Sequence, residues 1–159
     1  MRMLLFSLVG ALTACGPGAG NAKAHWLGTA VDVSMTAPAR GSWCPVSRTV
    51  LVEATAGDRA TGVSWRFDSL RPGVYPVGLP ATADSAGSGA SVAARYIQLD
   101  EVRGYRSING TLTVTTIDTT SISAKVAATL QRVGEPDSIH YTATFHAVRL
   151  QRDSTLCPR

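Results

Sequence analysis

The feature that most constrains the fold of this sequence is an alternation of apolar and polar residues with a period of two. The clearest run places Ile122, Ala124, Val126, Ala128 and Leu130 on one side of an extended segment, with mostly polar residues between them. Successive side chains of a β-strand point to opposite faces, so this run predicts a strand with one buried face. Threonine and valine, which are frequent here, favour the same extended backbone.

The same alternation recurs along most of the chain, and no segment after the N-terminal region predicts a helix. Short strands joined by turns indicate an all-β fold, and we expect an antiparallel β-sandwich of about seven or eight strands. A small closed β-barrel is the alternative, because the period does not distinguish the two. The other alternating segments begin at Val31, Val50, Val63, Val92, Leu112 and Ile139.

Two local features of the strands are also predicted. Pro72, Gly73 and Pro76 restrict residues 74–77 to a short edge strand. In the last strand the apolar parity shifts between Phe145 and Val148. A β-bulge near His146 accounts for this shift, unless the strand end is covered on both faces.

The first fourteen residues have the three-part layout of a secretory signal: a positive start at Arg2, an apolar run over residues 3–12, and small residues before Cys15. A ten-residue helix spans about 15 Å, half of the roughly 30 Å hydrocarbon core. We therefore expect a helical signal peptide over residues 1–14. A flexible linker is expected over residues 15–24, and a single β-rich domain over residues 25–159.

Leu12-Thr13-Ala14-Cys15 resembles the lipobox of bacterial lipoproteins. This resemblance implies cleavage before Cys15 and acyl chains on its thiol and new N-terminus, and each buried methylene adds about 0.8 kcal/mol of membrane affinity. Gly16, in place of Asp, implies the outer membrane in a host with two membranes. An ordinary signal cut nearby is the alternative, with Cys15 either discarded or left as a free thiol. The segments "RPGVYPVG" and "INGTLTVTTID" also resemble small β-rich bacterial lipoproteins of unknown role.

The remaining cysteines, Cys44 and Cys157, form an even pair once Cys15 is acylated. In an oxidising compartment we expect a disulfide between them. Such a bridge requires the "GSWCPVS" segment to lie beside the C-terminal end of the last strand. Because these cysteines are far apart, with no Cys-x-x-Cys motif and no histidine at ligand spacing, they do not indicate a redox or metal pair.

Charge and motifs give no sign of catalysis or nucleic-acid binding. Without residues 1–14 the chain keeps fourteen Lys or Arg and eleven Asp or Glu, and the arginines form no cluster. This mild excess favours a solvated, weakly basic surface, with contact to anionic lipid headgroups or envelope polymers as the alternative. No Gly-x-Ser-x-Gly elbow is present, and His140 and His146 lie about 20 Å apart on a straight strand. We expect no catalytic residue, metal site or cofactor.

Trp26 and Trp43 stand outside the regular alternation, so they are the candidate ligand-contact aromatics, with packing near the linker as the alternative. The sequence predicts a non-catalytic, lipid-anchored protein of the cell envelope that binds or supports an envelope protein or polymer. One alternative is a carrier of a small apolar ligand, with a cavity lined by residues such as Val114, Val126 and Phe145. The other is a hydrolase with a dispersed site, for example Ser107, His140 and Asp100.

Overall fold

The computed structural model describes residues 20–79 and 88–152. The expected signal peptide, Cys15 and Cys157 lie outside these residues. Within them the chain forms nine strands and no helix, so the predicted all-β fold is confirmed. The strands are β1 (Asn21–Gly28), β2 (Val31–Cys44), β3 (Thr49–Ala56), β4 (Arg59–Arg66), β5 (Gly73–Val77), β6 (Gly89–Gln98), β7 (Glu101–Ile117), β8 (Ser121–Arg132) and β9 (Ser138–Arg152).

Hydrogen bonds join these strands into one closed barrel in the order β1-β2-β3-β4-β6-β5-β7-β8-β9, with β9 paired back to β1. Most pairs are antiparallel, as expected. The pairs β2–β9 and β5–β6 are parallel, so the sheet is mixed. The sequence left a β-sandwich and a closed β-barrel open, and the hydrogen-bond order is that of a closed barrel.

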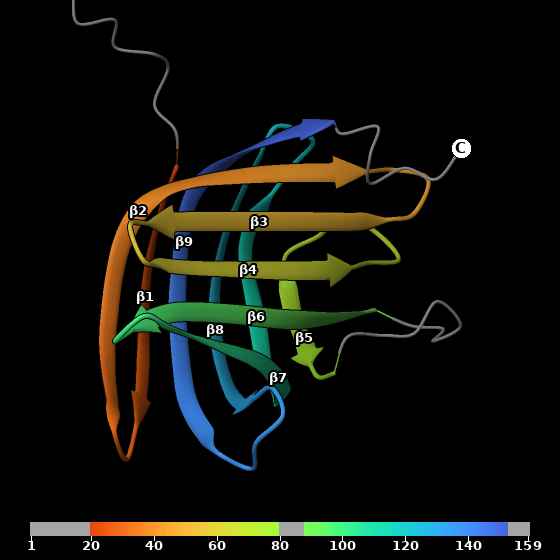
Figure 1. Cartoon of the computed structure of the whole chain (residues 1–159). Coiled ribbons are helices and arrows are strands. Elements are labelled where there is room, and N and C mark those ends of the chain that lie inside the picture. The colour runs from red at the N-terminus through yellow and green to blue at the C-terminus, as the bar shows by residue number, and fades with distance from the viewer. Residues whose placement is uncertain (1–19, 80–87, 153–159) are drawn as a thin grey trace, which may run out of the picture.

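The barrel is flattened into two layers whose strands cross at a steep angle. Figure 1 shows β3, β4 and β6 running across one layer, with β1, β8 and β9 running down the other; β2 bends from one layer into the other. Strands that bend between layers form the corners in this kind of packing. The core fills the space between the layers.

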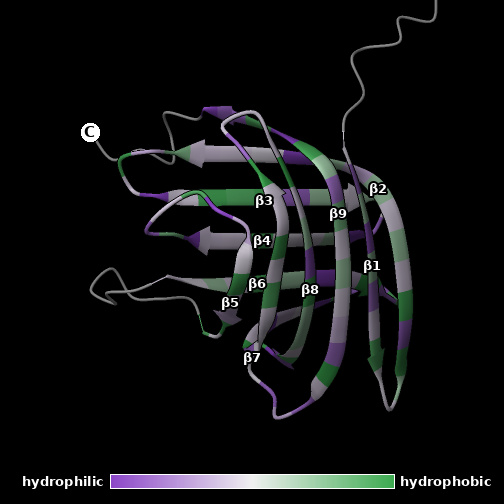
Figure 2. Ribbon diagram, turned by 180° about the vertical axis from the view of Figure 1, so that it is seen from behind, coloured by the Kyte–Doolittle hydropathy of each residue, from purple (hydrophilic) through white to green (hydrophobic). Residues whose placement is uncertain are grey.

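The alternating pattern lies on the strands as predicted. Figure 2 shows apolar and polar positions alternating along β2 and β9. In β8 all five predicted positions from Ile122 to Leu130 are buried. In β4, Val63 and Trp65 are buried, and the core continues into Phe67 just after the strand. Period and burial therefore agree wherever the sequence pattern is regular.

The predicted linker was too long, because β1 begins at Asn21. Ala22 and Ala24 are buried on the same face as Trp26, between β2 and β9. Residues 21–24 thus belong to the domain, and His25, the first residue of the predicted domain, lies in the middle of a strand. This strand was not predicted because the buried residues at its start are small, although they alternate with polar ones.

The bulge predicted near His146 is confirmed. Ile122 pairs with Val148 whereas Ala124 pairs with Phe145, so β9 carries one extra residue between them. Ala147 has a positive φ of 46°, and its N–H donates to Ser123 Oγ over 2.9 Å. The bulge moves the buried face from odd to even positions, which explains the parity shift.

The predicted short strand at residues 74–77 is present as β5, which pairs with β7 over its whole length and touches β6 at Val77. Ser107, fully buried where these strands meet, accepts a hydrogen bond from Val92 N over 2.9 Å and donates one to Gly78 O.

Among the described residues, no helical segment combines the length and apolar character needed to cross a membrane.

Candidate functional site

Cys44, the only predicted disulfide residue within the described ranges, ends β2 and is buried. Its neighbours Gly41, Ser42 and Trp43 pair in parallel with residues 150–152 at the end of β9. The predicted adjacency of the "GSWC" segment and the C-terminal end of the last strand is confirmed. The bridge to Cys157 stays a prediction.

Trp26 does not fit the role of a ligand-contact aromatic, and the alternative of packing describes it. Its side chain is fully buried and meets Tyr141 edge-on, with ring centroids 5.7 Å apart. Trp43 is half-buried and packs against the core. Trp26 belongs to the packing of the domain, because β1 continues through a segment that the sequence analysis assigned to a linker.

The histidines do not gather into a site. His25 Nε2 lies 2.8 Å from Asp32 Oδ1 on the exposed side of the β1–β2 pair. Within the described ranges, no hydrogen bond joins His140 or His146 to a serine or a carboxylate. The same ranges contain no group of three His, Cys, Asp or Glu residues that could hold a metal ion.

The interior between the layers is well filled. Around Trp65, Leu112 and Phe145 the core leaves a hollow of only about 10 Å³. That is about the space needed to hold one water molecule, whereas ligand pockets measure hundreds of cubic ångströms. The packing gives no support to the alternative of an apolar-ligand carrier with its cavity among these core residues.

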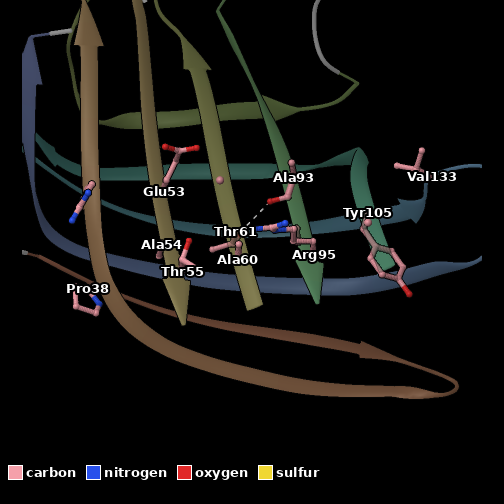
Figure 3. A pocket seen from close by; sticks show the side chains of 14 residues that line it. Pro38, Glu53, Ala54, Thr55, Ala60, Thr61, Ala93, Arg95, Tyr105 and Val133 are labelled. Atoms are coloured by element: carbon pink, nitrogen blue, oxygen red, sulfur yellow. Dashed lines mark hydrogen bonds between the residues drawn. The ribbon is translucent and has the colours of Figure 1, made fainter. Parts of the chain in front are cut away.

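A much larger hollow, about 800 Å³, lies on the outer face of the sheet and is called the outer groove here. It crosses strands β2, β3, β4, β6 and β7 (Figure 3). Its lining is Pro38 and Arg40 of β2, residues 53–55 of β3, residues 60–62 of β4, residues 93–95 of β6, Gly104 and Tyr105 of β7, and Val133.

The outer groove exists because small residues line up across the strands on the outward face. Gly62 pairs with Ala93, and in the next outward row Ala60 pairs with Arg95, which pairs with Gly104. A Cβ at Gly104 would meet no atom within 4 Å. The main chain therefore forms the floor of the groove. The residues between these rows point into the core and contribute their backbone to that floor.

Beneath this floor, Thr61 is a buried polar residue. Its hydroxyl lies 2.5 Å from Tyr141 Oη inside the barrel and 3.3 Å from the carbonyl oxygen of Ala93, the contact dashed in Figure 3. Burial raises the pKa of Tyr141 well above its usual value. Both hydroxyls are satisfied, so the floor is held by interior contacts.

Three charged side chains in the outer groove have no partner within residues 20–79 and 88–152. Arg40, Glu53 and Arg95 form no ion pair or side-chain hydrogen bond there, although Arg40 and Glu53 face each other across β2 and β3. In contrast, Arg132 nearby binds both Glu101 and Glu135. The groove combines an open floor with charges that the fold leaves available.

The far end of the groove is lined by Val133 and by the main chain near Tyr105, whose side chain is buried. The ring of Tyr105 stacks on that of Tyr96, with centroids 6.0 Å apart and planes 13° apart. Burial raises the pKa of Tyr105 to about 12, with a further contribution from its hydrogen bond to Tyr96. Val133 is 60% exposed, so this end adds an apolar wall to a polar groove.

Sequence reasoning did not find the outer groove. Its residues come from five strands that pair side by side but are not all consecutive in the chain, since β6 lies beside β4. The available signal was a set of Gly and Ala residues at outward positions, where polar side chains are usual. That signal becomes a site only when the register aligns Gly62, Ala93 and Gly104.

No protein-family model, curated protein or solved structure matches this chain. The candidate site is therefore defined by the chain's own geometry. Its components are the outer groove, the floor of small residues, and the charges of Arg40, Glu53 and Arg95, which no side chain among the described residues pairs.

Proposed function

We propose that this chain is a lipid-anchored protein of the bacterial cell envelope whose β domain binds an envelope component in the outer groove. The observation that carries the binding role is the 800 Å³ hollow with Arg40, Glu53 and Arg95, which have no charged or hydrogen-bonded side-chain partner in the described part of the chain. Concave sites of this volume with a few convergent polar groups are the usual places of ligand binding.

The division of the domain into a filled interior and an open outer groove supports binding from outside. The core residues hold the strands rigid beneath the groove, and Thr61 ties its floor to Tyr141. A site built on packed strands holds its side chains with less ordering cost than one on loops. The groove is thus preorganised for a partner that approaches the surface.

The anchor would keep this groove close to the membrane. Cys15 precedes Gly20, the first described residue, by five positions. A flexible segment of this length has a typical reach of about 12 Å. A partner in the membrane surface or in the adjoining envelope layer would then lie within reach of the domain.

Metabolic labelling with a fatty acid tests the anchor. The chain should take up label and partition with membranes, whereas Cys15→Ala should do neither, because the thiol that accepts the first acyl chain is gone. Cys44→Ala serves as a control that keeps the label. Equal labelling of the wild type and Cys15→Ala would refute the anchor.

The disulfide between Cys44 and Cys157 is part of the same proposal, because it requires export. The parallel pairing of Trp43 with Arg152 brings the ends of β2 and β9 side by side. Closing a loop of about 100 residues stabilises a fold by up to about 4.7 kcal/mol. Alkylation without reductant should leave both thiols unmodified, and free thiols at these positions would contradict the pairing.

Site-directed crosslinking tests the groove. A photoreactive residue placed at Ala93, on the groove floor, should capture a specific envelope component in intact cells, and one placed at Arg149 on β9 should not. Gly104→Trp should abolish the capture, since its side chain fills the groove without meeting a neighbouring atom at Cβ. Capture that is equal at both positions, or that Gly104→Trp leaves unchanged, would refute a binding role for the groove.

A further inference from the structure

The charges of the outer groove alternate in sign along its length. Arg40 and Glu53 are register partners across β2 and β3. Arg95 lies two strands beyond Glu53, on β6, and two residues further along. Ideal sheet spacings put the Cα atoms of Glu53 and Arg95 about 12 Å apart. Positive groups therefore stand on both sides of one negative group.

Each of these groups selects a different partner. A guanidinium binds a carboxylate or phosphate oxyanion, often through two parallel hydrogen bonds. An ionised carboxylate accepts hydrogen bonds only, so Glu53 selects a donor, most strongly a cationic one. Figure 3 shows Arg95 directed from β6 toward β4, which is the strand between it and Glu53.

A ligand of a single charge sign fits this arrangement poorly. A polyanion attracted to Arg40 and Arg95 would also place negative charge against Glu53, and a polycation would meet both arginines. Like charges placed side by side repel each other and weaken such a complex. A ligand with one oxyanion and one amine matches both signs.

We propose that the outer groove binds a zwitterionic group in which an oxyanion contacts Arg95 or Arg40 and a primary ammonium contacts Glu53. This inference rests on the proposed function and specifies its ligand. A phosphate joined to a primary amine by a two-carbon link has the required chemistry, as a lipid headgroup or as a free solute. The small floor at Gly62 and Gly104 gives such a group access to the bases of these side chains.

Calorimetric titration of the full-length protein in non-ionic detergent tests the inference with three matched probes. Phosphoethanolamine should bind at least fivefold more tightly than phosphocholine, which lacks N–H donors, and more tightly than inorganic phosphate, which lacks the cation. Equal affinity for the three probes, or no binding of phosphoethanolamine, would overturn the inference.

Variants separate the two contacts. Glu53→Gln should remove the preference for phosphoethanolamine over phosphocholine while keeping the affinity for phosphate. At least one of Arg95→Gln and Arg40→Gln should weaken phosphoethanolamine binding at least fivefold, and unchanged binding in both variants would contradict the oxyanion contact. Arg149→Gln, an exposed arginine outside the groove, should change neither value. A preference that survives Glu53→Gln would contradict the role of that carboxylate.

Vesicles distinguish the two sources of the ligand. The Cys15→Ser variant should sediment with vesicles that present phosphoethanolamine headgroups, and less with phosphocholine vesicles, if the headgroup of a lipid enters the groove. Binding of the soluble probe without vesicle binding supports a free solute instead. If crosslinking at Ala93 succeeds while all three probes fail, the groove binds a ligand of another class and only this inference falls. If both fail, the binding role falls as well.

Discussion

The two faces of strands β3, β4 and β6 differ sharply, although inward and outward residues alternate along the same strands. On the inner face, Val52, Val63 and Val92 form one register row and fill the core. On the outer face the adjoining row is Glu53, Gly62 and Ala93, which leaves the groove open. The inner hollow is about 10 Å³ and the outer one about 800 Å³.

This difference teaches that the period of a pattern and the size of its residues carry separate information. The period decides which face is buried, because burial of apolar area drives the strands together. Residue size decides whether a face is filled or hollow. On the outer face small residues are tolerated, since no core has to be packed there, and they leave a hollow.

The largest expected effect comes from emptying the filled face. Trp65 is fully buried, with ring centroids 4.6 Å from Tyr75 and 5.2 Å from Phe67. Trp65→Ala should lower the free energy of unfolding by about 3–5 kcal/mol, because a large cavity replaces these contacts. Urea denaturation measures the loss. A change below about 1 kcal/mol would show that the inner face is not the stabilising one.

Two glycines on β7 allow a crowded backbone position to be compared with a position in the open groove. Gly110 has φ +144°, and a Cβ there would lie 2.5 Å from the carbonyl oxygen of Ala127. Gly110→Ala should cost about 2–3 kcal/mol through strain and overpacking. Its effect is measured by urea denaturation beside Gly104→Ala, and equal losses would contradict the assignment of Gly104 to open space.

The threonines of the two faces provide a finer comparison. Thr61 points inward to Tyr141 Oη, whereas Thr55 points outward into the groove. Thr61→Val should destabilise by about 1–2 kcal/mol, because a buried hydroxyl loses its partner. Thr55→Val is the matched control, expected within about 0.5 kcal/mol. Thermal unfolding of both variants measures the difference, which would vanish if Thr61 were not held in the interior.

Alkaline pH should weaken the closed end of the groove. The pKa of Tyr105 is raised from 10.0 to about 12, mainly by burial, so the native state keeps a proton that the unfolded state releases first. Stability is therefore full below pH 10 and falls as the pH rises toward 12, by about 1 kcal/mol at pH 11. Urea midpoints between pH 8 and pH 11.5 test this. Tyr105→Phe should flatten the fall, and an unchanged slope would contradict the shift.

The smallest effect is expected on the groove floor itself. Gly104→Ala adds a methyl group that meets no atom within 4 Å, and its φ requires no glycine. The free energy of unfolding should change by less than about 0.5 kcal/mol. A much larger loss in urea denaturation would mean that the floor is packed against something.

Much of the fold was predictable from local pattern. The run from Ile122 to Leu130, the parity shift at His146 and the short strand at residues 74–77 each matched an element of the structure. Strand β1 was missed because its alternation is carried by Ala22 and Ala24, which bury little area each and resemble a linker. Trp26 was misjudged for the same reason.

The outer groove could not be predicted in this way. Arg40, Glu53 and Arg95 share no spacing in the sequence that suggests a site. They share one face because β6 pairs directly with β4, although β5 comes between them in the chain, and alternation alone does not specify this pairing. Local period fixes the face of a residue but not its neighbour on the next strand.

The sequence by itself determined that this chain is a β protein and which side chains would enter its core, since period and apolar area are local properties. Only the tertiary structure decided the closure of the sheet, the burial of Trp26 and the alignment of Gly62, Ala93 and Gly104 into one floor. Register between strands distant in the chain depends on the packing of the whole core. The groove is a product of that register.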